Sequence, residues 1–101
     1  MLNLLLSSLI TTSQVQLVAQ STTVYLPIST TQSKRQNCIT YTATNATEQT
    51  VRDVNLNRRN SQGEIIKYSL NEHLNYRPLK AGETVAFDMC DNSFVNVEAR
   101  Q

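Results

Sequence analysis

The chain has few of the residues that most kinds of chemical site require. It contains only two glycines and a single histidine among its 101 residues. A phosphate-binding loop needs several closely spaced glycines, so Gly63 and Gly82 exclude that kind of nucleotide site. Blue-copper centres use two histidines and a cysteine, so His73 alone excludes them as well. Strong helix formers are also sparse after residue 21, which disfavours a helical fold.

The charge is nearly balanced, with nine basic and eight acidic residues. Nucleic-acid binders usually cluster Lys and Arg on one face, whereas the only adjacent basic pairs here are Lys34-Arg35 and Arg58-Arg59. No basic amphipathic helix follows residue 21, so binding to a membrane surface is not expected either. We therefore expect no nucleic-acid partner and no stable membrane span in the mature protein.

No charged side chain occurs before Lys34, and the chain opens with an apolar run. The small-x-small triplet Ala19-Gln20-Ser21 is typical of signal-peptidase sites. Together these features predict a signal peptide over residues 1–21 and a single secreted or periplasmic domain over residues 22–101. The run lacks a basic start, and an N-terminal strand or short helix of a cytosolic protein is the alternative. A transmembrane helix is not expected, because polar residues 11–14 interrupt the run.

Apolar and polar residues alternate in six short segments, and this period is typical of strands. The predicted strands span residues 24–29, 39–43, 52–58, 66–70, 85–89 and 95–99. Pro27 places the first at a sheet edge or strand end, and the turn at residues 60–63 predicts a hairpin of the third and fourth. Capping-box spacing from Ser69 to Glu72 predicts one helical turn near residues 71–75. These elements predict an all-β fold, a small antiparallel β-sandwich of about six strands.

The only two cysteines flank predicted strands. Cys38 opens the strand at residues 39–43, and Cys90 closes the one at residues 85–89. If those strands are antiparallel neighbours, the two residues meet at one end, which predicts a disulfide in an exported protein. Two free thiols are the alternative in a cytosolic protein. A zinc site would need a fourth ligand beyond these cysteines and His73.

The cysteine spacing and the six strands resemble the architecture of an immunoglobulin-like sandwich. The diagnostic marks of that family are a Trp on an inner strand and a Tyr two residues before the second Cys. This chain has no Trp, and Asp88 stands in the Tyr position. The resemblance therefore implies an architecture and carries no family membership or activity.

No motif predicts catalysis, and we expect no cofactor and no metal. His73 lies in a predicted loop without a nearby nucleophile, which indicates an exposed loop histidine. The spacing of Asp88, Asp91 and Asn92 differs from that of a calcium-binding loop and indicates a solvated turn. The triplet Asn45-Ala46-Thr47 matches the N-glycosylation sequon, which matters only in a eukaryotic secreted protein.

The remaining candidates define an interaction surface rather than a reaction centre. We expect basic residues to gather on the predicted hairpin, and tyrosine is favoured at interfaces. The candidate surface consists of Arg52, Arg58, Arg59, Lys67 and Tyr76. A solvated edge that resists sheet-to-sheet association is the alternative. We expect a non-enzymatic binding or structural module with an unknown protein or glycan partner; the alternative is a small enzyme inhibitor or hydrolase with its site on the loop at residues 71–80.

Overall fold

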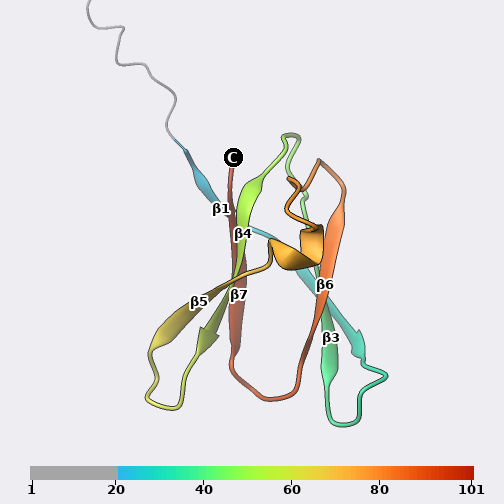
Figure 1. Cartoon of the computed structure of the whole chain (residues 1–101), viewed down its shortest axis with the longest axis vertical. Helices are drawn as coiled ribbons and strands as arrows, with labels where there is room; N and C mark the ends of the chain where they lie inside the picture. The colour runs from blue at the N-terminus through green and yellow to red at the C-terminus, as the bar shows by residue number, and fades with distance from the viewer. Residues whose placement is uncertain (1–20) are drawn as a thin grey trace, which may run out of the picture.

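A computed structural model describes residues 21–101 and shows seven strands in two antiparallel sheets, with one short 3₁₀ helix in that part of the chain (Figure 1). The elements are β1 (Thr23–Tyr25), β2 (Ile28–Gln32), β3 (Ile39–Thr44), β4 (Arg52–Arg59), β5 (Ile65–Ser69), η2 (Glu72–Leu74), β6 (Thr84–Met89) and β7 (Phe94–Arg100). Sheet A has the order β1-β7-β4-β5, and sheet B has the order β2-β3-β6. The all-β prediction is confirmed. The predicted export segment lies outside the described residues, apart from Ser21.

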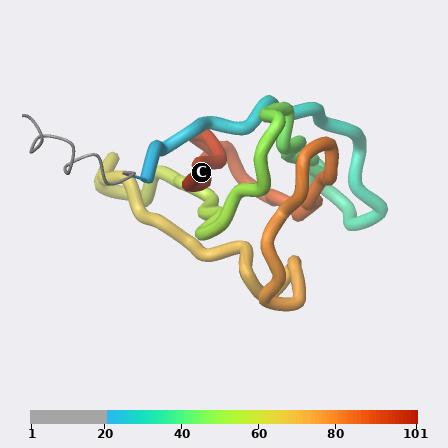
Figure 2. Tube along the Cα trace, turned by 90° about the horizontal axis from the view of Figure 1, so that it is seen from above, coloured from blue at the N-terminus to red at the C-terminus, as the bar shows by residue number. Residues whose placement is uncertain are grey.

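The predicted first strand is two strands, which corrects the expected number. β1 pairs with β7 in sheet A, whereas β2 pairs with β3 in sheet B. The change of sheet falls between Leu26, whose N–H donates to the Val97 carbonyl at 2.9 Å, and Pro27, whose carbonyl accepts from the Thr44 N–H at 3.1 Å. Proline has no N–H to leave unpaired at such a crossing. The segment runs along one side of the molecule and joins the two sheets there (Figure 2).

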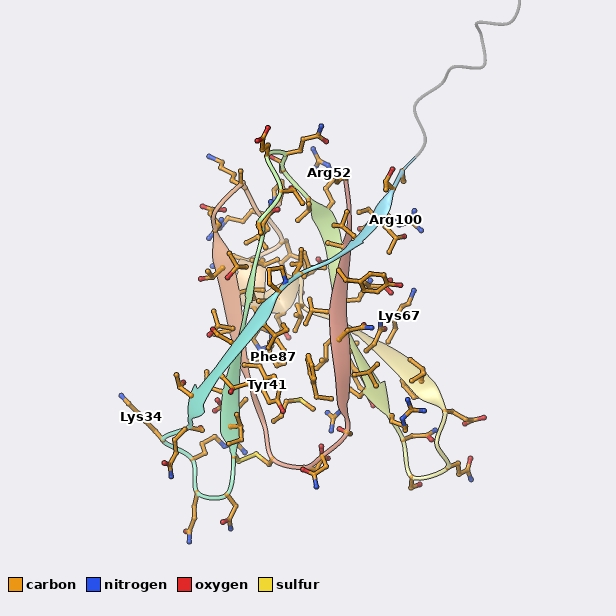
Figure 3. The ribbon with its side chains drawn as sticks, turned by 180° about the vertical axis from the view of Figure 1, so that it is seen from behind. Lys34, Tyr41, Arg52, Lys67, Phe87 and Arg100 are labelled. Atoms are coloured by element: carbon orange, nitrogen blue, oxygen red, sulfur yellow. A yellow bond between two sulfur atoms is a disulfide. The ribbon has the colours of Figure 1, made fainter. Side chains whose placement is uncertain are left out.

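The hydrophobic core lies between the two sheets because each sheet turns one apolar stripe inward. Sheet A contributes Val54, Leu56 and Val97, and sheet B contributes Val85 and Phe87, all at most 6% exposed. Aromatic rings extend the core toward one end. The Tyr41 ring lies 4.4 Å from Phe94 and 5.7 Å from Phe87, measured between centroids. Figure 3 shows Tyr41 and Phe87 close together between the sheets.

The predicted hairpin and helical turn are both present. β4 and β5 pair in antiparallel register, with Leu56 opposite Tyr68. The helical turn is η2, but it does not use the predicted capping box. Asn71 occupies the N-cap without a side-chain capping bond, and the Ser69 hydroxyl accepts a hydrogen bond from the Asn71 N–H at 3.1 Å. The serine therefore shapes the entry to the turn rather than its first helical residues.

A buried asparagine ties the loop after β3 to the segment after η2. The Asn45 side chain is 0% exposed. Its Nδ2 donates to the carbonyls of Gln49 at 2.8 Å and Leu79 at 3.0 Å, and its Oδ1 accepts from the Thr47 N–H at 3.0 Å. Both amide hydrogens are therefore used inside the protein. The glycosylation sequon at Asn45 is inaccessible in the folded chain.

The two cysteines form the predicted disulfide. β3 and β6 are antiparallel neighbours, with Ile39 opposite Met89. The Cys38–Cys90 bond continues this ladder by one residue pair, with the Cα atoms 4.1 Å apart. Neighbouring strands bring such non-hydrogen-bonded positions to about 4.5 Å, so the ladder itself sets the cysteines at bonding distance. The bond closes the end of sheet B.

Replacing both cysteines by alanine is expected to lower the free energy of unfolding by about 4 kcal/mol, since the bond joins residues 52 apart in sequence and restricts the unfolded chain. Urea denaturation of the oxidised wild type and of the Cys38→Ala/Cys90→Ala protein measures the difference. Wild type treated with reductant is the matched control and should unfold at the urea midpoint of the double variant. An unchanged midpoint after reduction would contradict the prediction.

Candidate functional site

A mismatch in strand number opens one side of the fold. Sheet A has four strands and sheet B has three, and the crossing from β1 to β2 aligns the sheets on one side. On the other side β5 extends beyond β6, with no strand opposite it among residues 21–101. All five residues of β5 are exposed, although Tyr68 lies on the same face as the buried Leu70. Tyr68 is 49% exposed, since no other residue of the described part of the chain covers the inner face of β5 there.

The open side holds a cleft of about 560 Å³ between β5 and β6, which we call the lateral cleft. The η2 turn lies beside β6 and covers part of this side (Figure 1), with Leu74 only 3% exposed. Where η2 does not cover this side, the hydrophobic core itself forms the base of the cleft. The base consists of Leu56, Leu70, Phe87 and Met89, each at most 6% exposed. The lateral cleft is therefore an apolar slot between the two sheets.

Arg58 forms a fixed polar wall on the sheet A side of the lateral cleft. Its Nη2 lies 2.9 Å from the Asp91 Oδ2, and its Nε donates to the Ser93 hydroxyl at 3.0 Å. Its guanidinium carbon also lies 5.3 Å from the centroid of the Tyr68 ring, within cation–π range. These contacts hold both side chains in one arrangement. Hydrogen bonds from Ser93 and the charge of Arg58 lower the pKa of Asp91, which keeps its carboxylate ionised.

The sheet B side of the lateral cleft carries Asp88 and the histidine. The Thr40 hydroxyl donates to the Asp88 Oδ1 at 2.6 Å, and this bond is the largest cause that lowers the pKa of Asp88. Ser69 and His73 line the same cleft. The Ser69 hydroxyl, however, is bonded to the Asn71 N–H, and His73 is exposed without a hydrogen bond to any described residue. The three side chains are therefore not linked as a nucleophile, a base and an acid.

The residues of the predicted interaction surface lie at separate places in the structure. Arg52 and Tyr76 line a small hollow of about 170 Å³ at the start of β4. Arg58 and Arg59 lie at the other end of that strand, roughly 20 Å away for six residues of extended chain. Figure 3 shows Arg52 far from Lys67, which pairs with Glu98 at 2.9 Å. Of these residues only Arg58 lines the lateral cleft.

A polar cluster on sheet A explains the position of Lys67. The Asn57 Nδ2 donates to the Asn96 Oδ1 at 2.8 Å and to the Glu98 Oε1 at 2.9 Å. Hydrogen bonds from Lys67 and then Asn57 lower the pKa of Glu98. The Asn57 Oδ1 is buried and has no partner within residues 21–101. Exchanging its oxygen and nitrogen would set the oxygen against two acceptors, so the observed orientation is the favourable one.

Comparison of the chain with protein-family models, with curated proteins and with solved structures found no match. In the part of the chain that the structure describes, no helix has the length and apolarity needed to cross a bilayer. The same residues contain no group of three or more His, Cys, Asp or Glu side chains arranged to hold a metal ion.

Replacing Asp91 by asparagine is expected to destabilise the protein near neutral pH and to have progressively less effect in acid. The pKa of Asp91 is lower in the folded chain than its usual 3.8. Its contribution to stability is therefore present above that value and is lost as the pH falls through the folded pKa. Urea midpoints of wild type and Asp91→Asn at about pH 7, 5 and 3 measure this. The other carboxylates titrate in both proteins, so a difference that stays constant with pH would contradict the assignment.

Proposed function

We propose that this chain is a small exported β-sandwich, immunoglobulin-like in architecture, that acts as a non-enzymatic binding module. Its recognition site is the lateral cleft. The observation that carries this proposal is the exposure of Tyr68 beside an apolar base that belongs to the hydrophobic core. Apolar pockets with a few fixed polar groups at the rim are typical of binding sites.

The rim of the lateral cleft supports recognition rather than catalysis. Arg58 is held by Asp91 and Ser93 and lies against Tyr68, so the rim is ordered before any partner arrives. Preorganised side chains reduce the entropy lost on binding. Catalysis by His73 would need an acid or a nucleophile within hydrogen-bond reach. Its cleft neighbours Ser69 and Asp88 are instead bonded to Asn71 and Thr40.

A second candidate is an enzyme inhibitor that uses the loop at residues 71–80. Tyr76 is 77% exposed near the tip of this loop. The loop is fixed at both ends, because the Tyr76 N–H donates to the Asn71 carbonyl at 2.8 Å and Leu79 pairs with Val51. An exposed side chain on a loop with fixed ends loses little entropy on binding, which suits an inhibitor. Tyr76 on this loop and Tyr68 in the lateral cleft therefore lie on two separate candidate surfaces, and one capture experiment can compare them.

Replacing Tyr68 by alanine is expected to reduce the capture of a partner by at least about tenfold, as for the loss of a central aromatic contact. The wild-type protein and the variant, each immobilised, are exposed to extracts of the compartment in which the protein is found. Quantitative mass spectrometry then compares the proteins retained by each. The measurement seeks a partner that the wild type retains and Tyr68→Ala does not.

Tyr25→Ala is the matched control, since Tyr25 is 62% exposed on β1 at the opposite side of sheet A. This variant should retain the partner at the wild-type level. Loss of the partner with Tyr76→Ala but not with Tyr68→Ala would favour the inhibitor candidate. Equal retention by all variants would contradict a role for the lateral cleft.

The export part of the proposal predicts a mature protein that lacks about 21 residues. The prediction is tested by the intact mass of the protein isolated from its host, both from the medium and from cell fractions. Alkylation without reductant should leave the mass unchanged, because Cys38 and Cys90 are bonded, and reduction should allow two additions. A full-length protein with two alkylated thiols in the cytosolic fraction would overturn the export proposal.

A further inference from the structure

At the edge of β6 beside the lateral cleft, some backbone groups have no partner in the part of the chain that the structure describes. In the antiparallel ladder between β3 and β6, the Asn45 N–H donates to the Glu83 carbonyl, which fixes which pairs are hydrogen-bonded. Hydrogen-bonded pairs alternate along a ladder, so Val85 and Phe87 point their N–H and C=O groups toward β3. Ala86 and Asp88, between and after them, point theirs away from β3, toward the lateral cleft.

These outward groups have no strand beside them in residues 21–101. β6 is the last strand of sheet B, and η2 lies beside it without forming a ladder. Ala86 and Asp88 both line the lateral cleft. Each offers one N–H and one C=O, two residues apart, which is the repeat of an extended chain. The cleft therefore combines an apolar slot with a short template for strand pairing.

The unequal sheets determine what such a strand would cover. A strand added beside β6 would become the fourth strand of sheet B and would lie opposite β5. Packed sheets lie about 10 Å apart, so its inward side chains would meet the exposed ring of Tyr68. The same side chains would fill the space above Leu56 and Phe87 at the base of the cleft. Within residues 21–101, the position beside β6 where sheet B has no fourth strand is therefore also the position of the lateral cleft.

We propose that the lateral cleft binds an extended segment of a partner polypeptide, which adds to sheet B as a fourth strand along Ala86–Met89. This inference rests on the proposed binding function and defines the class of partner. Every second residue of the bound segment is apolar and enters the cleft. Main-chain hydrogen bonds to Ala86 and Asp88 provide affinity, and the apolar side chains provide selectivity, as in other cases of strand addition.

The β6 strand of a second copy does not meet these requirements. Its apolar side chains, Val85, Phe87 and Met89, are already buried in its own core. Pairing two β6 edges would satisfy backbone groups but would leave the lateral cleft empty. The occupant must have apolar side chains that are not committed elsewhere, which a peptide segment in extended conformation has.

The test begins with random heptapeptides displayed on phage and selected on the disulfide-bonded protein. Counter-selection on Tyr68→Ala removes peptides that bind elsewhere. Enriched sequences are expected to alternate apolar and polar residues. Each is then synthesised with single N-methyl groups along its backbone, and dissociation constants are measured by fluorescence anisotropy.

N-methylation at alternate positions distinguishes strand pairing from simple insertion of apolar side chains. Methyl groups on amides that face β6 should weaken binding by at least about tenfold, whereas those on the intervening amides should leave it within about twofold. Equal effects at both sets of positions would overturn the proposal. Failure to enrich any cleft-dependent peptide would also overturn it, while a Tyr68-dependent partner from the capture experiment would leave the binding function standing.

Ala86→Pro tests the protein side of the same ladder. The Ala86 N–H faces away from β3, so proline there removes a donor to the bound segment without breaking the ladder within sheet B. Binding of the selected peptides should fall at least about tenfold while the urea midpoint stays near that of wild type. Binding unchanged in a folded variant would contradict strand addition. If the variant does not fold, the N-methyl series decides.

Light scattering of the protein alone tests whether a second copy of the chain occupies the lateral cleft. The proposal expects a monomer in the absence of peptide. A dimer that Ala86→Pro converts to a monomer would overturn it and assign this edge to self-association.

Discussion

The pairing of a four-stranded sheet with a three-stranded sheet determines most other features of this fold. The crossing at Leu26–Pro27 aligns the sheets on one side, so the whole mismatch falls on the other side. A sheet buries one face only where another layer covers it. β4 lies opposite β6 and is covered, whereas among residues 21–101 only the edge of η2 lies opposite β5. The exposed Tyr68 ring and the lateral cleft are direct consequences.

The narrow sheet is held at both ends, which gives its free edge a defined shape. At one end the Cys38–Cys90 bond closes the ladder of β3 and β6. At the other end Asn45 binds the Leu79 carbonyl and donates its own N–H to Glu83. A domain of about 80 residues buries only a modest core, so such fixed ends matter for its stability. They also keep β6 extended where it borders the lateral cleft.

Sequence periodicity predicted the features of the fold that depend on a local residue pattern and on a single antiparallel neighbour strand. Thr84–Met89 and its pairing through Cys90 are of this kind, because alternation assigns the faces and the cysteines assign the partner strand. The change of sheet at Leu26–Pro27 was not predicted, since Val24, Leu26 and Ile28 keep the same alternation across it. The cleft was not predicted either. Tyr68 has the pattern of a core residue, and its exposure depends on the number of strands in the opposite sheet.

For the candidate basic surface too, the sequence pattern did not predict how the residues are arranged in space. Arg52 and Arg58 are close in sequence, and the hairpin prediction grouped them. An extended strand, however, separates its ends by about 3.3 Å per residue, so one strand carries the two side chains to different ends of the molecule. Only Arg58 reaches the cleft, because Asp91 and Ser93 after β6 hold it there.

The short length of the free edge bears on specificity. An exposed edge strand is a template for any other edge, and proteins limit this by keeping such edges short or charged. The free part of β6 is bounded by η2 on one side and by the disulfide on the other, and Asp88 places a carboxylate on it. Few hydrogen bonds are therefore available, and backbone pairing alone gives weak binding. A segment gains useful affinity only if it pairs with Ala86 and Asp88 and also fills the slot against Tyr68, so the fold imposes two conditions on a partner where an open sheet edge would impose one.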